Sequence, residues 1–248
     1  MRKQTAEVQV GDFDEVTTCA ACPAFELSLC RAVEQVAKES SPTARLQPSE
    51  HTISARRMIC RKDDPFEVVP IICQGWAASM VTLPDGRRQI LSFLLPGDIV
   101  STVLIFEPVS QCSVEAITEV HYRTFERTEF KAALLKHSAL FDFLSNAWVE
   151  EKTRANQLAI DLGRRAADER IARLILNLLD RLARRGMARD QIIDFPLRQH
   201  YIADATGMTT VHVGKVLSEF RRAGLVEISD RSLTIIDLTG LRNVANIR

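Results

Sequence analysis

Three of the six cysteines lie close together near the start of this 248-residue sequence. Cys19, Cys22 and Cys30 form a C-x2-C-x7-C motif. Cysteine thiolates bind metal ions and take part in disulfide exchange, and closely spaced cysteines are typical of both kinds of chemistry. Structural disulfides are rare in the cytosol, where we expect this chain. The motif therefore indicates metal or redox chemistry.

A second candidate site lies near the end of the chain. Ala203 is a small residue, as two touching helices require, and Gly207 tolerates the positive φ of a tight turn. Val213 and Leu217 continue the apolar face and can pack a second helix against the first. This spacing predicts a helix-turn-helix.

The outer face of the predicted second helix carries the side chains that we expect to contact DNA. Lys215 can donate to guanine or phosphate, Thr210 and Ser218 can hold phosphates, and Val211 can contact a thymine methyl group. Thr209 can cap the helix, and two arginines near its end suit the helix dipole. The predicted DNA-binding residues are Thr209, Thr210, Val211, His212, Lys215, Ser218, Arg221 and Arg222.

The residues after this helix predict a β-hairpin. Residues 224–228 and 232–236 are strand-like and flank a short turn, which is typical of the wing of a winged helix-turn-helix. Residues 163–248 hold 15 Lys and Arg against 10 Asp and Glu, a net charge of +5, whereas residues 1–162 carry −5. A basic carboxy-terminal part on an acidic body favours an approach to phosphates.

The middle of the chain predicts an antiparallel β-roll. From residue 46 to residue 130, short β-rich runs alternate with turn sequences such as Pro84-Asp85-Gly86 and Pro96-Gly97-Asp98. The predicted strands are residues 67–72, 76–83, 89–94, 113–117 and 120–125.

A long helix is predicted after the roll. Apolar residues alternate at spacings of three and four over about six turns, which favours a dimer seam over a buried core helix. Glu151 on this stripe would repel its symmetry mate, so we expect a weak or conditional dimer. The predicted dimerisation residues are Phe141, Leu144, Trp148, Glu151, Ala155, Leu158 and Leu162. Residues 168–185 predict a further amphipathic helix.

These elements give an α+β fold with four parts. We expect a flexible tail (1–18), a sensory domain with the cysteine segment and the roll (19–130), a dimerisation helix (131–163) and a winged helix-turn-helix DNA-binding domain (164–248). The sequence has no apolar run of 18 residues and no secretory signal, so we expect a cytoplasmic protein without a membrane partner.

No catalytic constellation is visible, and we expect no enzyme. The five histidines are scattered, and known nucleophile, metalloprotease and phosphate-loop motifs are missing. A regulatory module that binds a ligand but not DNA is an alternative, although it would leave the basic winged element unexplained.

The order of these elements resembles the CRP/FNR superfamily of bacterial transcription regulators over roughly residues 19–240. The stretches that carry the resemblance are LPDGRRQILSFLLPGDIV (83–100), SVEAITEV (113–120), GRRAADERIARLILNLLDRLARRG (163–186) and GMTTVHVGKVLSEFRRAGLVEI (207–228). The resemblance implies a roll like a cyclic nucleotide-binding domain, a homodimer, a two-fold symmetric DNA operator and contact with RNA polymerase.

Two departures from the family pattern concern the DNA-reading helix. The family usually has a glutamate where this chain has Val211, and an arginine where it has Lys215. The glutamate accepts from cytosine N4, so we expect an operator that differs from the common family half-site. VHVGKVL instead resembles a variant subgroup with V-H-V-x-R at this place.

The roll also departs from the members that bind cyclic nucleotides. Those members carry Gly-Glu followed by an Arg-Ser pair that holds the cyclic phosphate. Here the corresponding stretches are Gly97-Asp98 and Ser110-Gln111-Cys112, which supply no cation for a phosphate. We therefore expect no cyclic nucleotide.

The cysteine motif resembles that of oxygen-sensing FNR-type members, which implies a [4Fe–4S] cluster. Those regulators take a fourth cysteine from the strand after the SVEAITEV turn, where this chain has Arg123. Cys112, on what we expect to be the partner strand of the same hairpin, is the candidate replacement, and Cys60 and Cys73 are weaker ones. Three interpretations stay open: a [4Fe–4S] oxygen sensor, a degenerate site or iron-free thiol switch, and zinc on three thiolates.

These parts suggest one mechanism as a hypothesis. A change at the cysteine site repacks the hairpin around Cys112 against the helix of residues 141–162 and shifts the dimer equilibrium. Only the dimer then places two recognition helices about 34 Å apart, one turn of DNA.

Overall fold

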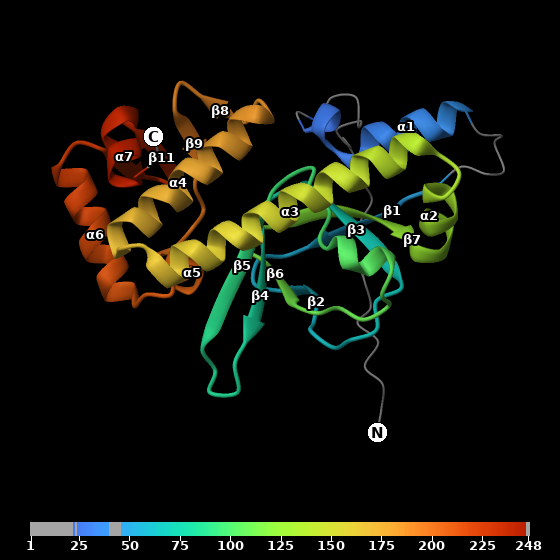
Figure 1. Ribbon diagram of the computed structural model, residues 1–248, viewed down its shortest axis with the longest axis horizontal. Helices are drawn as coiled ribbons and strands as arrows, with labels where there is room; N and C mark the ends of the chain where they lie inside the picture. The colour runs from blue at the N-terminus through green and yellow to red at the C-terminus, as the bar shows by residue number, and fades with distance from the viewer. Residues whose placement is uncertain (1–21, 23, 40–45, 247–248) are drawn as a thin grey trace.

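The computed structural model of the chain describes residue 22, residues 24–39 and residues 46–246. The β-rich amino-terminal part and the mainly helical carboxy-terminal part lie side by side, and one long helix, α3 (Ser138–Arg164), runs along both (Figure 1). No helix within the described ranges is long and apolar enough to cross a membrane.

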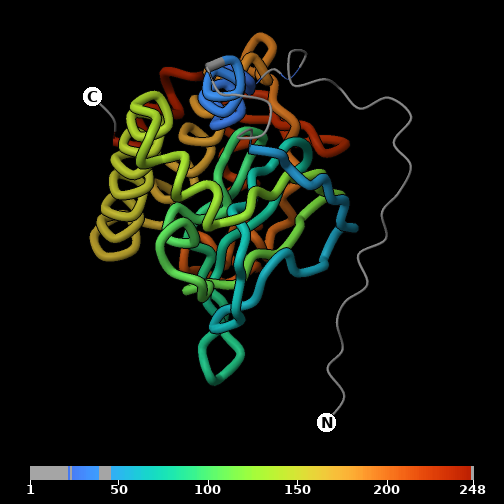
Figure 2. Tube along the Cα trace, turned by 90° about the vertical axis from the view of Figure 1, so that its right-hand side faces the viewer, coloured from blue at the N-terminus to red at the C-terminus, as the bar shows by residue number. Residues whose placement is uncertain are grey.

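The β-roll consists of two antiparallel sheets. One has the strand order β1-β7-β3 and the other the order β2-β6-β4-β5. The strands are β1 (Ser49–Ile53), β2 (Met58–Cys60), β3 (Val68–Gln74), β4 (Ala77–Thr82), β5 (Arg88–Leu94), β6 (Ser113–Ala116) and β7 (Val120–Glu126). The antiparallel roll is confirmed. Strands β1 and β2 were not predicted, because they are short and only partly apolar. The β4–β5 hairpin projects from the body in both views (Figures 1 and 2).

The expected hairpin of residues 113–125 is wrong. Strand β6 pairs with β2 and β4, whereas β7 pairs with β1 and β3, so the two belong to different sheets. The turn between them docks onto Gly75 and Trp76: the Ile117 amide donates to the Trp76 carbonyl, and the Trp76 amide donates to Thr118 Oγ1. A Cβ on Gly75 would lie 2.1 Å from the Glu119 carbonyl oxygen. This close approach carries the chain from one sheet to the other.

Within the described ranges four short helices accompany the roll, and the last of them, α2, leads into α3. They are η2 (Phe25–Leu27), α1 (Leu29–Glu39), η4 (Thr102–Ile105) and α2 (Arg127–Leu134). Leu29 of α1, Phe125 of β7, Phe130 of α2 and Leu140 of α3 form one buried cluster. The predicted dimerisation helix at 131–163 therefore needs a correction: residues 131–134 belong to α2, and α3 begins only at Ser138.

The carboxy-terminal domain is a winged helix-turn-helix, as predicted. Its elements are α4 (Ala167–Arg184), β8 (Ala188–Arg189), β9 (Ile192–Asp194), α5 (Gln199–Thr206), α6 (Thr210–Arg222), β10 (Val226–Ser229), β11 (Ser232–Ile235) and α7 (Leu238–Val244). The four strands form a sheet with the order β10-β11-β9-β8. Helix α7, which was not predicted, packs on α4 through the buried Leu241.

The carboxy-terminal domain packs against the roll of the same chain. Trp76, Met80 and Ile90 of the roll share one buried cluster with Tyr201 and Ile202 of α5. Such a continuous apolar contact holds the two domains in one fixed arrangement.

Polar contacts reinforce this interface. Arg88 of β5 pairs with Asp204 of α5 at 2.7 Å, and the Tyr201 hydroxyl donates to Glu115 of β6 at 3.0 Å. Burial and the nearby Glu115 carboxylate raise the pKa of Tyr201 to about 12, so this hydroxyl keeps its proton and remains a donor.

A buried ion cluster connects α4 to the turn after β5. Asp98 pairs with Arg181 through one carboxylate oxygen and with Arg185 through the other, at 2.6 Å for Arg185. Arg181 and Arg185 are only 4% and 9% exposed. Burial lowers the pKa of Arg181, and Asp98 opposes that shift. We call Asp98, Arg181 and Arg185 the domain clamp.

Replacing Asp98 by Asn should destabilise the protein by about 3–5 kcal/mol, because it leaves two buried guanidinium groups without a counter-charge. Urea denaturation at neutral pH, followed by circular dichroism, measures the loss. The control is Asp85→Asn, which breaks an exposed ion pair with Arg87 and should leave the midpoint nearly unchanged. Equal midpoints for the two variants would contradict a structural role of the clamp.

Candidate DNA interface and cysteine site

The turn between α5 and α6 has the geometry that the sequence predicts. Helix α5 ends at Gly207, whose φ of +66° lies in the left-handed region, and the Gly207 amide donates to the Ala203 carbonyl. The Thr209 side chain accepts from the His212 amide at 3.2 Å and caps α6. Val213 is fully buried against α5 and α4. A helix-turn-helix with a capped second helix results.

This turn also contacts the end of the long helix. A Cβ on Gly207 would lie 3.2 Å from Leu162 Cδ2 of α3, and Arg170 donates to the Thr206 carbonyl at 3.1 Å. The position of α6 is therefore tied to the end of α3.

The outer face of α6 is open to solvent. The exposed residues on it include every one of the predicted DNA-binding residues: Thr209, Thr210, Val211, His212, Lys215, Ser218, Arg221 and Arg222. Val211 is 82% exposed, which is unusual for a valine and leaves its methyl groups available to a partner. Lys215 has one exposed carboxylate neighbour, Glu219, at 4.0 Å. Such a weak contact leaves the Lys215 ammonium group free to reach into a groove of DNA.

The wing is fixed to the recognition helix. Val226 pairs with Ile235, and the two-residue turn between the strands has positive φ at Asp230 and Arg231, as tight hairpins require. Arg221 Nη2 donates to the Ile228 carbonyl at 3.2 Å. Arg221 thus holds the wing against α6 while its exposed guanidinium stays near the surface expected to face phosphates.

The amino-terminal cysteines are only partly within the described residues. Cys19 lies outside them, whereas Cys22 and Cys30 are half-buried and flank the single turn η2. In the part of the chain that the structure describes, no group of three His, Cys, Asp or Glu side chains lies close enough to hold a metal ion. Since Cys19 is missing from that search, the predicted three-thiolate set stays a prediction.

Cys112 lies in a different environment, just before β6. Ser79 Oγ donates to Cys112 Sγ at 3.0 Å, and Cys60 Sγ lies 4.0 Å from the Cys112 carbonyl oxygen and 3.5 Å from Ser110 Oγ. Burial raises the pKa of both thiols, to about 11 for Cys60. A metal ion that bound either thiol would have to displace its proton. Cys112 is half-buried, as the two described amino-terminal cysteines are, whereas Cys60 is buried.

The predicted dimer seam is divided between two faces of α3. Leu144 is buried inside its own protomer, and Glu151 accepts from Thr102 Oγ1 at 2.6 Å. Leu158 and Leu162 are half-buried on the side that faces α4. The prediction that Leu144 meets a symmetry mate is therefore wrong, because its side chain is buried in its own protomer, whereas Glu151 is only half-buried and its place in the seam stays a prediction.

The remaining face of α3 is apolar and exposed. Phe141 is 58% and Val149 66% exposed, and Ile160 and Trp148 are also open to solvent. Trp148 stacks on Phe106 with 5.2 Å between ring centroids. Ala155, from the predicted seam, is exposed near the same face.

Comparison with known proteins agrees with this geometry. The Crp-like helix-turn-helix domain matches residues 169–244, and the cyclic nucleotide-binding domain matches residues 50–137. The nitrogen fixation regulation protein FixK of Rhizobium meliloti is 32% identical over 167 residues, which cover 66% of this chain and 72% of that protein. The chain belongs to the CRP/FNR family.

Two further relatives cover more of this CRP/FNR protein. The nitrogen fixation regulation protein FixK of Bradyrhizobium diazoefficiens is 26% identical over 219 residues, covering 88% of this chain and 90% of that protein. The solved structure of FixK2 from Bradyrhizobium japonicum superposes with a TM-score of 0.72 at 27% identity, covering 80% and 98% of the two chains. The chain is thus a DNA-binding transcription regulator, and its relatives are regulators and not enzymes.

Sequence reasoning missed the residues that join the two domains. Arg88, Asp98, Arg181 and Arg185 look like ordinary surface charges in the sequence, because nothing local marks a charged residue as buried. A signal was present only for Asp98, which lies in the turn motif 96–98 of the family-like stretch.

Alkylation of Cys60 in the native protein should become faster by about tenfold for each pH unit between about pH 7 and pH 9. The thiolate is the reactive form, and a pKa of about 11 means that its fraction keeps rising throughout this range. Iodoacetamide labelling with peptide mass spectrometry measures the rate. In urea the alkylation rate of Cys60 should level off once the pH passes the ordinary pKa of a cysteine. A rate that also levels off in the native protein would contradict the raised pKa.

Proposed function

We propose that this regulator binds two-fold symmetric DNA as a homodimer and that its DNA binding responds to oxygen or redox state. The observation that carries the DNA part is the open outer face of α6, with the exposed Val211 and Lys215. Val211 would contact a thymine methyl group, and Lys215 would donate to guanine or to phosphate. RNA polymerase is the expected protein partner.

The exposed face of α3 supports a homodimer. Phe141, Val149 and Ile160 give it apolar side chains that nothing within the described residues covers. Two long helices joined along such a face form a parallel pair, which suits two recognition helices about 34 Å apart. This face keeps Phe141, Trp148 and Ala155 of the predicted seam and adds Val149 and Ile160.

Replacing Lys215 by Glu should weaken DNA binding by about tenfold or more, because a donor to a base or phosphate becomes a repelling charge. Gel shift or fluorescence anisotropy against fragments of total promoter DNA measures the change. Lys136→Glu makes the same charge change at an exposed site on the roll side and should bind like the wild type. Unchanged retention of the Lys215 variant would count against DNA reading by this helix.

The sensing part rests on the three amino-terminal cysteines. Cys22 and Cys30 fit a cluster or a zinc ion in one respect: both are half-buried thiols next to a single turn, so one short segment could wrap a metal. Cys112, the candidate fourth ligand, is also half-buried, and a metal ion there would replace the hydrogen bond that its thiol accepts from Ser79. An iron–sulfur cluster would supply a group whose stability depends on oxygen.

Protein purified without oxygen should show the visible absorption of a [4Fe–4S] cluster, with iron and sulfide in equal amounts. Cys22→Ser should lose most of the colour, because it removes one of the three predicted thiolates. Cys73→Ser, a half-buried cysteine of β3, is the matched control and should keep it. Colourless protein that contains zinc, or no metal, would contradict the cluster and leave the zinc site or the thiol switch.

A further inference from the structure

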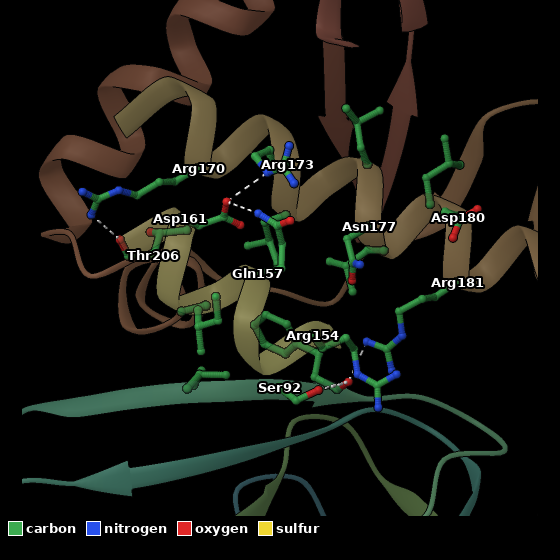
Figure 3. A pocket seen from close by; sticks show the side chains of 18 of the residues that line it. Ser92, Arg154, Gln157, Asp161, Arg170, Arg173, Asn177, Asp180, Arg181 and Thr206 are labelled. Carbon is green, nitrogen blue, oxygen red and sulfur yellow. Dashed lines mark hydrogen bonds and ion pairs between the residues drawn. The ribbon is translucent and has the colours of Figure 1, made fainter. Parts of the chain in front are cut away.

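A cavity of about 500 Å³ lies where β5, α3, α4, the end of α5 and α7 meet (Figure 3). Leucines such as Leu91, Leu158 and Leu174 give it an apolar wall. Only its β5 residues fall within residues 50–137, the part that matches the cyclic nucleotide-binding domain. The cavity therefore lies outside the roll interior, at the junction of the roll with the DNA-binding domain.

Two arginines from different helices enter one corner of this cavity. Arg154 comes from α3 and Arg181 from α4, and Figure 3 shows both side chains reaching the region beside Ser92. Each Nε is buried and has no hydrogen-bond partner among the described residues. Arg181 as a whole is 4% exposed. Arg181 donates from Nη1 to the Phe93 carbonyl at 2.9 Å and from Nη2 to Asp98, so its Nε is the donor left open. A buried donor without an acceptor is costly.

The charges at this corner repel one another. Burial is the main cause of the lowered pKa of Arg181, and the neighbouring Arg154 lowers it further. Glu150 lies near Arg154 at 3.4 Å, but it is half-exposed and is shared with Arg184 at 3.6 Å. Negative charge in the cavity would offset this repulsion.

Two of the other three arginines that line the cavity already have acceptors. Arg173 pairs with Asp161 at 2.9 Å, and Arg170 donates to the Thr206 carbonyl at 3.1 Å. These contacts, drawn as dashed lines in Figure 3, hold the walls of the cavity in place. The third, Arg242, is exposed, so the buried donors that stay open at the cavity are those of Arg154 and Arg181.

We infer that this cavity binds a small organic anion, with its phosphate or carboxylate held by Arg154 and Arg181 and its apolar part against the leucine wall. Charge-assisted bonds to guanidinium groups are the strong contacts of such a site. The cavity lies on the α4 side of α3, away from the exposed residues Phe141 and Val149. Dimerisation through that exposed face leaves it accessible within each protomer.

The bound anion would act on the domain clamp. Arg181 is shared between the cavity and Asp98, so an anion that draws on its guanidinium weakens the contact between α4 and the roll. The position of α6 relative to the roll then changes with occupancy. This regulatory step rests on the proposed DNA-binding function, whereas binding of the anion does not.

Isothermal titration calorimetry without DNA tests the binding. The probes are phenyl phosphate and phenylacetate, which distinguish a phosphate from a carboxylate head, with benzyl alcohol as the neutral analogue. We expect saturable binding of at least one anion and none of the alcohol. Arg154→Gln should weaken it about tenfold, and Arg164→Gln, an exposed arginine on the same helix, should bind within about twofold of the wild type.

The inference is overturned if neither anion binds the wild type up to about 10 mM, or if Arg154→Gln binds as tightly as Arg164→Gln. Equal midpoints of thermal unfolding for the two variants establish that any loss of anion binding is local to the cavity. Adding the bound anion to a protein–DNA complex should shift the DNA affinity of the wild type but not of Arg154→Gln. Binding of the anion with no DNA binding by the wild type would contradict the proposed function and leave the cavity assignment intact.

Discussion

The carboxylate of Asp98 lies between two buried guanidinium groups of α4, and this contact sets how the DNA-binding domain sits on the roll. Buried charges are tolerated only with close partners, so the turn at 96–98 and α4 must meet in one geometry. The Leu95 amide donates to the same carboxylate at 2.8 Å, which fixes the turn itself. Because α4 packs directly on α5 and α6, the clamp also fixes the direction of the recognition helix.

Helix α3 is the element that all parts of the molecule share. One face contacts the roll through Leu144 and through Glu151, another contacts the turn at Gly207 through Leu162, and a third is apolar and exposed. A change in the contacts of one face can therefore alter the contacts of the other two directly, because all three belong to the same helix. Coupling of this kind needs two arrangements of similar free energy, which a small shift at an interface can supply.

The two candidate sites differ in how well local chemistry defines them. The helix-turn-helix depends on a left-handed Gly207 and the Thr209 cap, and both are present with the expected hydrogen bonds. The cysteine site depends on residues at a distance, and its proposed fourth member, Cys112, is a half-buried thiol that accepts a hydrogen bond from Ser79. The DNA-reading surface is accordingly defined residue by residue, while the sensory chemistry rests on three thiols near the start of the chain.

The sequence by itself determined the parts whose cause is local. The positive φ at Gly207, the cap at Thr209 and the apolar periodicity of α4 each act within a few residues, so the winged helix-turn-helix and most strands of the roll could be predicted. Only the tertiary structure decided which face of α3 is exposed, that β6 and β7 belong to different sheets, and that Asp98 meets Arg181 across 83 residues of chain. Those outcomes depend on which distant groups are buried together, and a one-dimensional pattern carries no record of that choice.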